Sequence, residues 1–178
     1  MFTTTPFSAW ELNDDLLAGL ESIGWEFATQ VQKETIPLAL SGSDVIVQAR
    51  TGSGKTAAFG LPTMNACQPT GELQALILAP TRELANQVAE ELSNIQGDTG
   101  LNIQTVYGGT DLEKQAKNLQ AGVDIIVGTP GRVMDMTERG FINLEKPTLF
   151  VLDEADRMLD MGFFTDIMWV IERMTNRE

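Results

Sequence analysis

The sequence predicts an α/β fold in which a parallel sheet is flanked by helices. Short apolar runs rich in β-branched residues recur along the 178-residue chain. Most of these runs are continuous rather than alternating, which is typical of strands covered on both faces. The segments between them carry helical periodicity instead. Strands that alternate with helices favour a parallel sheet, whose ligands gather at the carboxyl ends of the strands.

Two helices are expected before the first strand. They cover residues 11–22 and 29–40, and end at Gly24 and near Gly42. Five strands are then expected, at residues 45–48, 75–79, 103–107, 124–127 and 148–152.

Amphipathic faces predict the helices between the later strands. One face consists of Leu84, Val88, Leu92 and Ile95, and another of Leu112, Ala116 and Leu119, closed by Gly122. No repeat or linker interrupts the pattern. We therefore expect one domain, with residues 1–42 as a helical lead-in to the body at 43–178.

The composition excludes several kinds of chemistry. Cys67 is the single cysteine and there is no histidine, so a Cys/His zinc cluster and imidazole catalysis are both excluded. No apolar run is long enough to span a bilayer, and the amino terminus does not read as a signal peptide. We expect a cytoplasmic protein with no membrane partner.

The net charge of −13 argues against an indiscriminate basic surface for nucleic acid. Two interpretations of this acidity stay open. It can serve solubility, for example in a salty cytosol, or a basic segment can lie elsewhere in a longer protein.

A glycine-rich loop with phosphate-binding character follows the first expected strand. The segment ARTGSGKT, residues 49–56, leads into an apolar helix. Gly52 and Gly54 let successive amides converge on phosphate oxygens, Lys55 reaches the β- and γ-phosphates, and Thr56 offers a hydroxyl to Mg²⁺. The alternative is a glycine turn with only a structural role.

Two adjacent carboxylates follow the last expected strand. Asp153 is expected to hold Mg²⁺, largely through water, and Glu154 to orient or deprotonate the attacking water. The alternative is that these residues cap the following helix.

Several motifs in order resemble those of DEAD-box ATP-dependent RNA helicases. They are ARTGSGKT, then PTRELA at 80–85, the pair Gly108-Gly109, TPGR at 129–132 and DEAD at 153–156. The resemblance implies a RecA-like P-loop NTPase domain that uses ATP and Mg²⁺, a hydrolase active in unwinding RNA. It also implies catalytic roles for Lys55, Asp153 and Glu154, and a role for Asp156 in coupling to a second domain.

The segment GWEFATQVQ, residues 24–32, is similar to the adenine-sensing Q motif of the same family. A glutamine amide donates and accepts at once, so Gln32 can read an adenine edge. Thr29 and Gln32 also stand in the relation of a capping box, and both roles can hold. The nucleotide site that the resemblance implies comprises Phe7, Trp25, Thr29, Gln32, Ala49, Arg50, Thr51, Gly52, Ser53, Gly54, Lys55 and Thr56.

For RNA, the resemblance implies residues that face the sugar–phosphate backbone of one strand without reading its sequence. They are Pro80, Thr81, Arg82, Gly108, Gly109, Thr129, Gly131 and Arg132. Arginine forks and glycine-exposed amides suit phosphate. Taken alone, Arg82 and Glu83 read as an exposed pair at a helix start. Met158, Leu159, Met161 and Phe163 are expected to pack in the core or between helices.

The family's Ser-Ala-Thr motif and its second RecA-like domain lie outside this sequence. We therefore expect an incomplete lobe that is inactive by itself, with the second domain as its partner. The strand after the DEAD motif would lie between residues 45–47 and 150–152, so an empty slot is expected there. This slot predicts low stability or association through exposed edges.

Two other functions stay open beside the helicase lobe. One is another P-loop NTPase, such as a DNA helicase, which would give no reason for Phe7 and Gln32. The other is a catalytically silent module that binds nucleotide or partner proteins.

Overall fold

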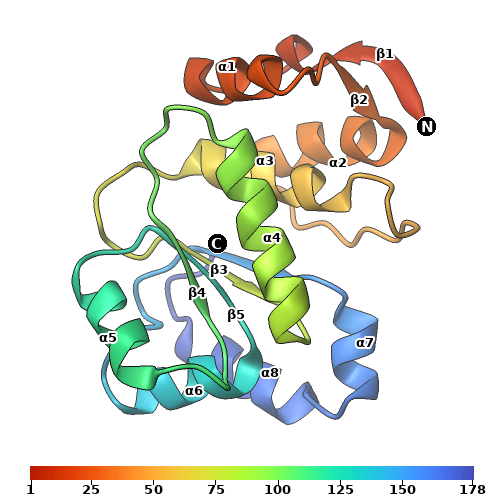
Figure 1. The fold of residues 1–178 in the computed structure, drawn as a ribbon. Helices are drawn as coiled ribbons and strands as arrows, with labels where there is room; N and C mark the ends of the chain where they lie inside the picture. Colours follow the sequence, from red (N-terminus) through yellow and green to blue (C-terminus); the bar gives the residue numbers. More distant parts are fainter. The chain divides into compact units, whose positions relative to one another are not determined.

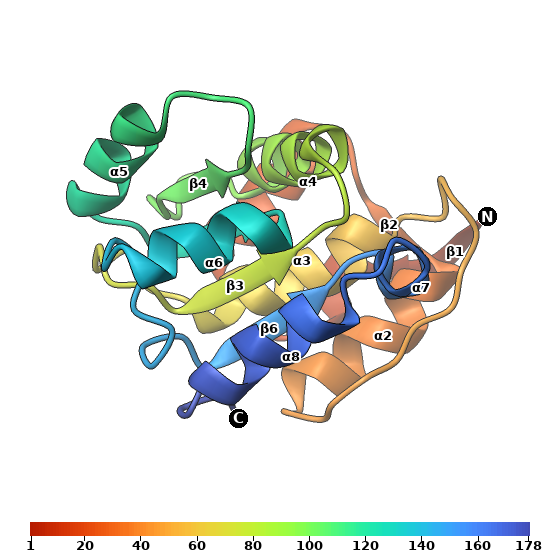
Figure 2. The same cartoon turned by 90° about the horizontal axis from the view of Figure 1, so that it is seen from below.

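The predicted parallel sheet is present, with four strands in place of five. The computed structural model describes residues 1–178. Its sheet contains β3 (Ala75–Leu78), β4 (Ile103–Val106), β5 (Ile125–Gly128) and β6 (Leu149–Leu152). These strands pair in parallel in the order β4-β5-β3-β6. Figure 1 labels β3, β4 and β5, and Figure 2 labels β6. Each lies within one residue of its expected range, and the α/β fold class is confirmed.

The expectation of a strand at residues 45–48 is wrong. This segment has no regular secondary structure, and Val45, Ile46 and Val47 are 39%, 101% and 38% exposed. A strand needs a neighbour that pairs with its N–H and C=O groups. The sheet ends at β6, which pairs only with β3. An apolar β-branched run without such a neighbour stays irregular.

The chain divides into two compact units. The first comprises Met1–Gln68 with Glu90–Gly100, and the second comprises Pro69–Ala89 with Leu101–Glu178. The predicted division at residue 42 stays a prediction. The first unit contains β1 (Phe2–Pro6), a 3-10 turn (Phe7–Ala9), α1 (Asp14–Ser22), β2 (Phe27–Thr29), α2 (Gln30–Leu40) and α3 (Lys55–Ala66). Helix α4 (Arg82–Ile95) has residues in both units.

Local signals decide where the first helices begin. Helix α1 starts at Asp14 rather than at residue 11, because the Asn13 side chain caps it by accepting from the Leu16 amide at 2.9 Å. Helix α2 starts after Thr29, which caps it. The antiparallel pair β1–β2 was not expected from the sequence.

The core of the second unit lies between the sheet and its helices. These helices are α5 (Leu112–Gln120), α6 (Pro130–Glu138), α7 (Ala155–Asp160) and α8 (Phe164–Arg173). Leu76 and Leu78 of β3 and Ile126 of β5 belong to one buried cluster with residues of all four helices. Helices α6 and α8 lie side by side (Figure 2).

Strands β3 and β5 are buried on both faces, as their continuous apolar runs predicted. Ile77 and Val127, which alternate with the cluster residues, are also fully buried. A fully buried side chain of this size contributes roughly 1.5–3 kcal/mol. No helix of the chain is both long enough and apolar enough to cross a bilayer.

Candidate nucleotide and RNA sites

The glycine-rich loop runs into α3 as the sequence predicted, although it follows an irregular segment and not a strand. Gly52 and Gly54 have φ angles of 78° and 89°, in the left-handed region that favours glycine. Lys55 is the first residue of α3 and Thr56 the second, and both are half-buried. The loop therefore places its lysine and its hydroxyl at a helix N-terminus.

The loop has features that fit a phosphate group. No side chain caps the N-terminus of α3, so its first amides stay available to an anion. The Ser53 hydroxyl is buried without a hydrogen-bond partner, which a phosphate oxygen would supply. These residues fit the phosphates of a nucleotide, and Thr56 fits a magnesium ion held largely through water.

Gln32 joins the Q-motif segment to the loop within the first unit. It is 2% exposed, its Oε1 accepts from the Thr29 amide at 2.9 Å, and its Nε2 donates to the Gly54 carbonyl at 3.2 Å. The capping box between Thr29 and Gln32 is thus confirmed. A Cβ on Gly54 would lie 2.5 Å from Gln32 Nε2, so a larger residue at position 54 would displace the Gln32 amide group.

The aromatic residues of the Q-motif region form a cluster. Phe7 is 3% exposed. Its ring stacks on that of Trp25 at 6.5 Å between centroids and meets Trp10 edge-on at 6.1 Å. The structure thus brings Phe7 and Trp25 together, as a packed pair. Ala49, Arg50 and Thr51 precede the glycines in the same unit.

The carboxylate pair lies directly after β6. The Asp153 amide donates to the Leu78 carbonyl at 2.9 Å, which extends the pairing of β6 with β3. Glu154 is the only non-glycine residue with a positive φ, at 52°. It occupies the position before α7 without capping the helix, and its Oε2 lies 3.8 Å from Arg157. The alternative role as a helix cap is therefore wrong for the Glu154 side chain. Asp156 is exposed in the first turn of α7.

A groove of about 510 Å³ lies at the carboxyl ends of β3, β4 and β5 in the second unit. It brings together seven of the eight residues predicted to face RNA, although these come from three separate segments. Its lining consists of Pro80, Thr81, Arg82, Gly108, Thr129, Gly131, Arg132, Asp135 and Phe163. Gly109, the remaining predicted residue, follows Gly108 with a φ of 81°.

Neither groove arginine has a carboxylate partner. The guanidinium of Arg82 lies over the Tyr107 ring, 5.0 Å from its centroid. Arg132 donates from Nη1 to Gln115 Oε1 at 3.1 Å and from Nη2 to the Thr110 carbonyl at 3.4 Å. The chain has two ion pairs, Arg139 with Asp135 and Arg157 with Glu154. Both groove arginines therefore keep their full charge for a ligand.

Sequence reasoning missed Asp135 as a lining residue and assigned Phe163 to packing alone. Phe163 packs against the core and also lines the groove. Met158 is buried as expected, whereas Leu159 and Met161 are 50% and 47% exposed, so the packing expectation for these two is wrong. The helical spacing from Arg132 to Asp135 was a usable signal for Asp135, since residues three apart share a helix face.

A parallel α/β sheet and a glycine-rich phosphate loop are features of P-loop NTPases as a class. A sequence model of the DEAD/DEAH box helicase family matches residues 29–178. The chain belongs to this family, which confirms the resemblance noted in its motifs.

Curated relatives and solved structures agree with the family. The RNA helicase CrhR of Synechocystis is 49% identical over 96% of this chain and 35% of its own length. The DEAD-box ATP-dependent RNA helicase CshA of Streptococcus pneumoniae is 49% identical over 94% of this chain and 32% of its own length. The chain thus spans about a third of the length of these relatives.

The crystal structure of a DEAD box protein from Methanococcus jannaschii has a TM-score of 0.93 and 39% identity, covering all of this chain and 49% of that one. That of a hypothetical ATP-dependent RNA helicase from Sulfolobus tokodaii has a TM-score of 0.86 and 37% identity, covering 93% of this chain and 48% of that one. The fold of this chain is therefore that of the RecA-like domains in these two structures.

Proposed function

We propose that this chain is the ATP- and RNA-binding lobe of a DEAD-box RNA helicase, which couples ATP hydrolysis to local separation of an RNA duplex. The observation that carries the proposal is the groove. Three motif segments far apart in the sequence line one cavity, and both of its arginines lack carboxylate partners. Such a site suits a phosphate backbone and does not need base contacts.

The glycine-rich loop supplies the nucleotide site in this proposal. The first amides of α3 and the Lys55 ammonium hold the phosphates, and Gln32 reads the adenine edge. A magnesium ion bound there would neutralise charge on the phosphates. Thr56 and Asp153 would hold this ion largely through water, and Glu154 would orient the attacking water or take its proton.

RNA binding fits the acidity of the chain because it needs only a local positive surface. The net charge is −13, yet Arg82 and Arg132 face one groove. Glycines at positions 108 and 131 leave room for backbone amides to approach phosphate. We propose that a single RNA strand lies along this groove.

Hydrolysis and unwinding require more than this lobe. The chain spans about a third of its relatives' length, and we propose that a second RecA-like domain supplies an arginine finger and the rest of the RNA site. By itself the chain is expected to bind ATP weakly, without turnover stimulated by RNA. Asp156, exposed in α7, is proposed to couple the two lobes.

Two binding measurements test this function. ATP with Mg²⁺ is expected to raise the melting temperature of the chain, and GTP to raise it less. Single-stranded RNA is expected to bind wild-type chain more tightly than the variants Arg82→Gln and Arg132→Gln. An equal response to ATP and GTP would count against the role of Gln32. No response to any nucleotide would favour the silent binding module.

A further inference from the structure

We infer that Tyr107 and Gln115 are positioning residues, which aim the two groove arginines through neutral contacts and so keep the full arginine charge for phosphate. The inference rests on the proposed RNA function of the groove. Neither residue belongs to the motifs that predicted the site, and neither lines the groove.

The contacts of Gln115 join two segments of the groove. Its Oε1 accepts from Arg132 at 3.1 Å. Its Nε2 donates to the Tyr107 carbonyl at 3.1 Å and to the Thr110 hydroxyl. The side-chain amide of Gln115 therefore holds both the loop that carries Gly108 and the Arg132 guanidinium at the start of α6.

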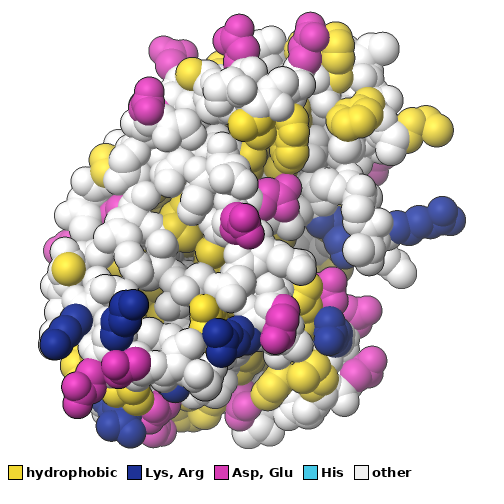
Figure 3. Space-filling model, viewed as in Figure 1, with side chains coloured by type: hydrophobic (Ala, Val, Ile, Leu, Met, Phe, Trp, Pro, Cys, Tyr) yellow, Lys and Arg dark blue, Asp and Glu magenta, His cyan; other side chains and the backbone are white.

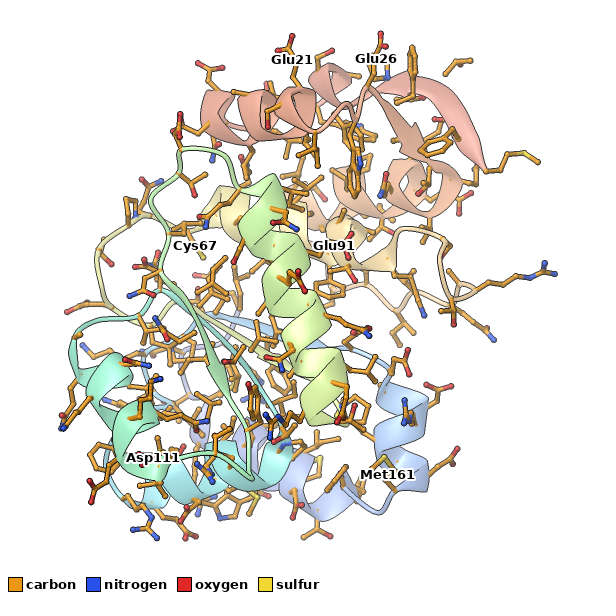
Figure 4. The ribbon with its side chains drawn as sticks, viewed as in Figure 1. Glu21, Glu26, Cys67, Glu91, Asp111 and Met161 are labelled. Carbon is orange, nitrogen blue, oxygen red and sulfur yellow. The ribbon has the colours of Figure 1, made fainter.

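The start of α5 explains why Gln115 reaches both partners. The Asp111 side chain caps this helix and accepts from the Glu113 amide at 2.9 Å. Asp111 lies at the lower end of α5 in Figure 4. The backbone N–H of Gln115 donates to the Asp111 carbonyl at 3.2 Å, so the first turn of α5 fixes the position of the Gln115 Cα, from which its side chain extends.

Tyr107 acts on the other arginine. The face of its ring lies 5.0 Å from the Arg82 guanidinium carbon, within the range of a cation–π contact. The hydrogen bond from Gln115 Nε2 to the Tyr107 carbonyl links the contact on Arg82 to the contact on Arg132. Arg82 and Arg132 are thus oriented through a chain of contacts that contains no formal negative charge.

The neutrality of these contacts has a consequence for phosphate binding. A carboxylate beside Arg132 would orient it equally well, but would compete with phosphate for the same N–H donors. An amide oxygen and an aromatic face orient a guanidinium without neutralising it. On a chain of net charge −13, this arrangement preserves the local positive potential that RNA needs.

The test replaces the amide by a carboxylate of nearly the same shape. Binding of a fluorescent single-stranded oligouridine is followed by anisotropy from about 50 to about 200 mM KCl. The variant Gln115→Glu is expected to bind RNA more weakly than wild type. Its plot of log affinity against log salt is expected to be shallower by about 0.7, the value for one phosphate contact to a single strand.

Gln120→Glu is the matched control, because it adds the same charge on the same helix at an exposed position. A salt slope for Gln115→Glu equal to that of Gln120→Glu would overturn the inference. Tyr107→Leu is the second arm, should Gln115→Glu not fold. It is expected to weaken binding several-fold, and Tyr107→Phe, which keeps the aromatic face, is expected to rescue it. Equal binding by the Leu and Phe variants would also overturn the inference.

The arginine variants separate this inference from the proposed function. If Arg132→Gln binds RNA as wild type does, the groove is not the RNA site and both proposals fail. If Arg132→Gln weakens binding while Gln115→Glu matches Gln120→Glu, only the positioning role fails.

Discussion

Glu154 combines an unusual backbone conformation with a proposed catalytic role. Its φ of 52° is in the left-handed region, which costs a non-glycine residue of order 1–3 kcal/mol. A residue that only ended a strand would gain nothing from this conformation. This conformation sets the direction in which the Glu154 side chain leaves the turn between β6 and α7.

In a full-length helicase that carries this lobe, Glu154→Gln is expected to keep ATP and RNA binding and to lower hydrolysis by about 10² or more. The amide keeps the shape of the side chain but cannot accept a proton from water. Steady-state ATPase rates check this, with Glu172→Gln at an exposed position of α8 as the control. Wild-type turnover by the Glu154 variant would remove this residue from the mechanism.

Lys55 is expected to matter for nucleotide binding and little for stability. It takes part in no ion pair, so its ammonium is available for phosphate. Lys55→Ala is expected to lower ATP affinity at least about tenfold, a loss of roughly 1.4 kcal/mol or more. Calorimetric titration measures the affinity, and a melting curve checks that the fold is intact. Affinity within a few-fold of wild type would contradict the assignment.

At the scale of elements, four strands and the capping of α2 could be predicted from the sequence. Apolar runs and a Thr-x-x-Gln spacing are local signals, and the structure confirms both. The prediction of a strand at 45–48 was wrong because a strand needs a neighbouring strand to pair with, and no local sequence pattern specifies that neighbour. The short pair β1–β2 was missed for the same reason, since its partners are distant in sequence.

In the candidate site too, local motifs could be predicted from the sequence, whereas contacts between distant elements could not. Motifs predicted Arg82 and Arg132, and the groove brings them together. Tyr107 and Gln115 could not be assigned, because their contacts with these arginines cross from one element to another. Spacing shows which residues share a helix face, but not which residue of another element lies against it.

The junction of loop and helix at Gly54 gives a prediction at this scale. Gly54→Ala is expected to destabilise the chain and weaken ATP binding more than Gly52→Ala does. Both positions have a positive φ, but only a Cβ at Gly54 meets Gln32 Nε2, at 2.5 Å, whereas nothing lies within 4 Å at Gly52. Melting temperatures and ATP titrations of both variants check this. Equal effects would show that backbone strain alone matters.

For the whole molecule, the excess of acidic side chains predicts a dependence on salt. Figure 3 shows several of them, in magenta, over the upper part of the view where α1 lies. With a net charge of −13, higher KCl is expected to raise the melting temperature by screening self-repulsion. Each kcal/mol gained would raise it by about 2–4 °C.

Melting curves from about 0.1 to about 1 M KCl measure this effect. The double variant Glu21→Gln with Glu26→Gln removes two exposed charges that project from the first unit in Figure 4, and is expected to show a smaller rise. A flat or falling curve for the wild-type chain would reject self-repulsion as a factor in its stability.

We propose that the groove at the ends of β3, β4 and β5 holds the backbone of an RNA strand. Photo-crosslinking with an oligouridine that contains 4-thiouridine, followed by peptide mapping, tests it most directly. Crosslinks are expected in residues 80–82, 107–110 and 129–135. Unlabelled RNA is expected to compete them away, and the double variant Arg82→Gln with Arg132→Gln to abolish them. Crosslinks that avoid all three segments, or that persist in this double variant, would contradict it.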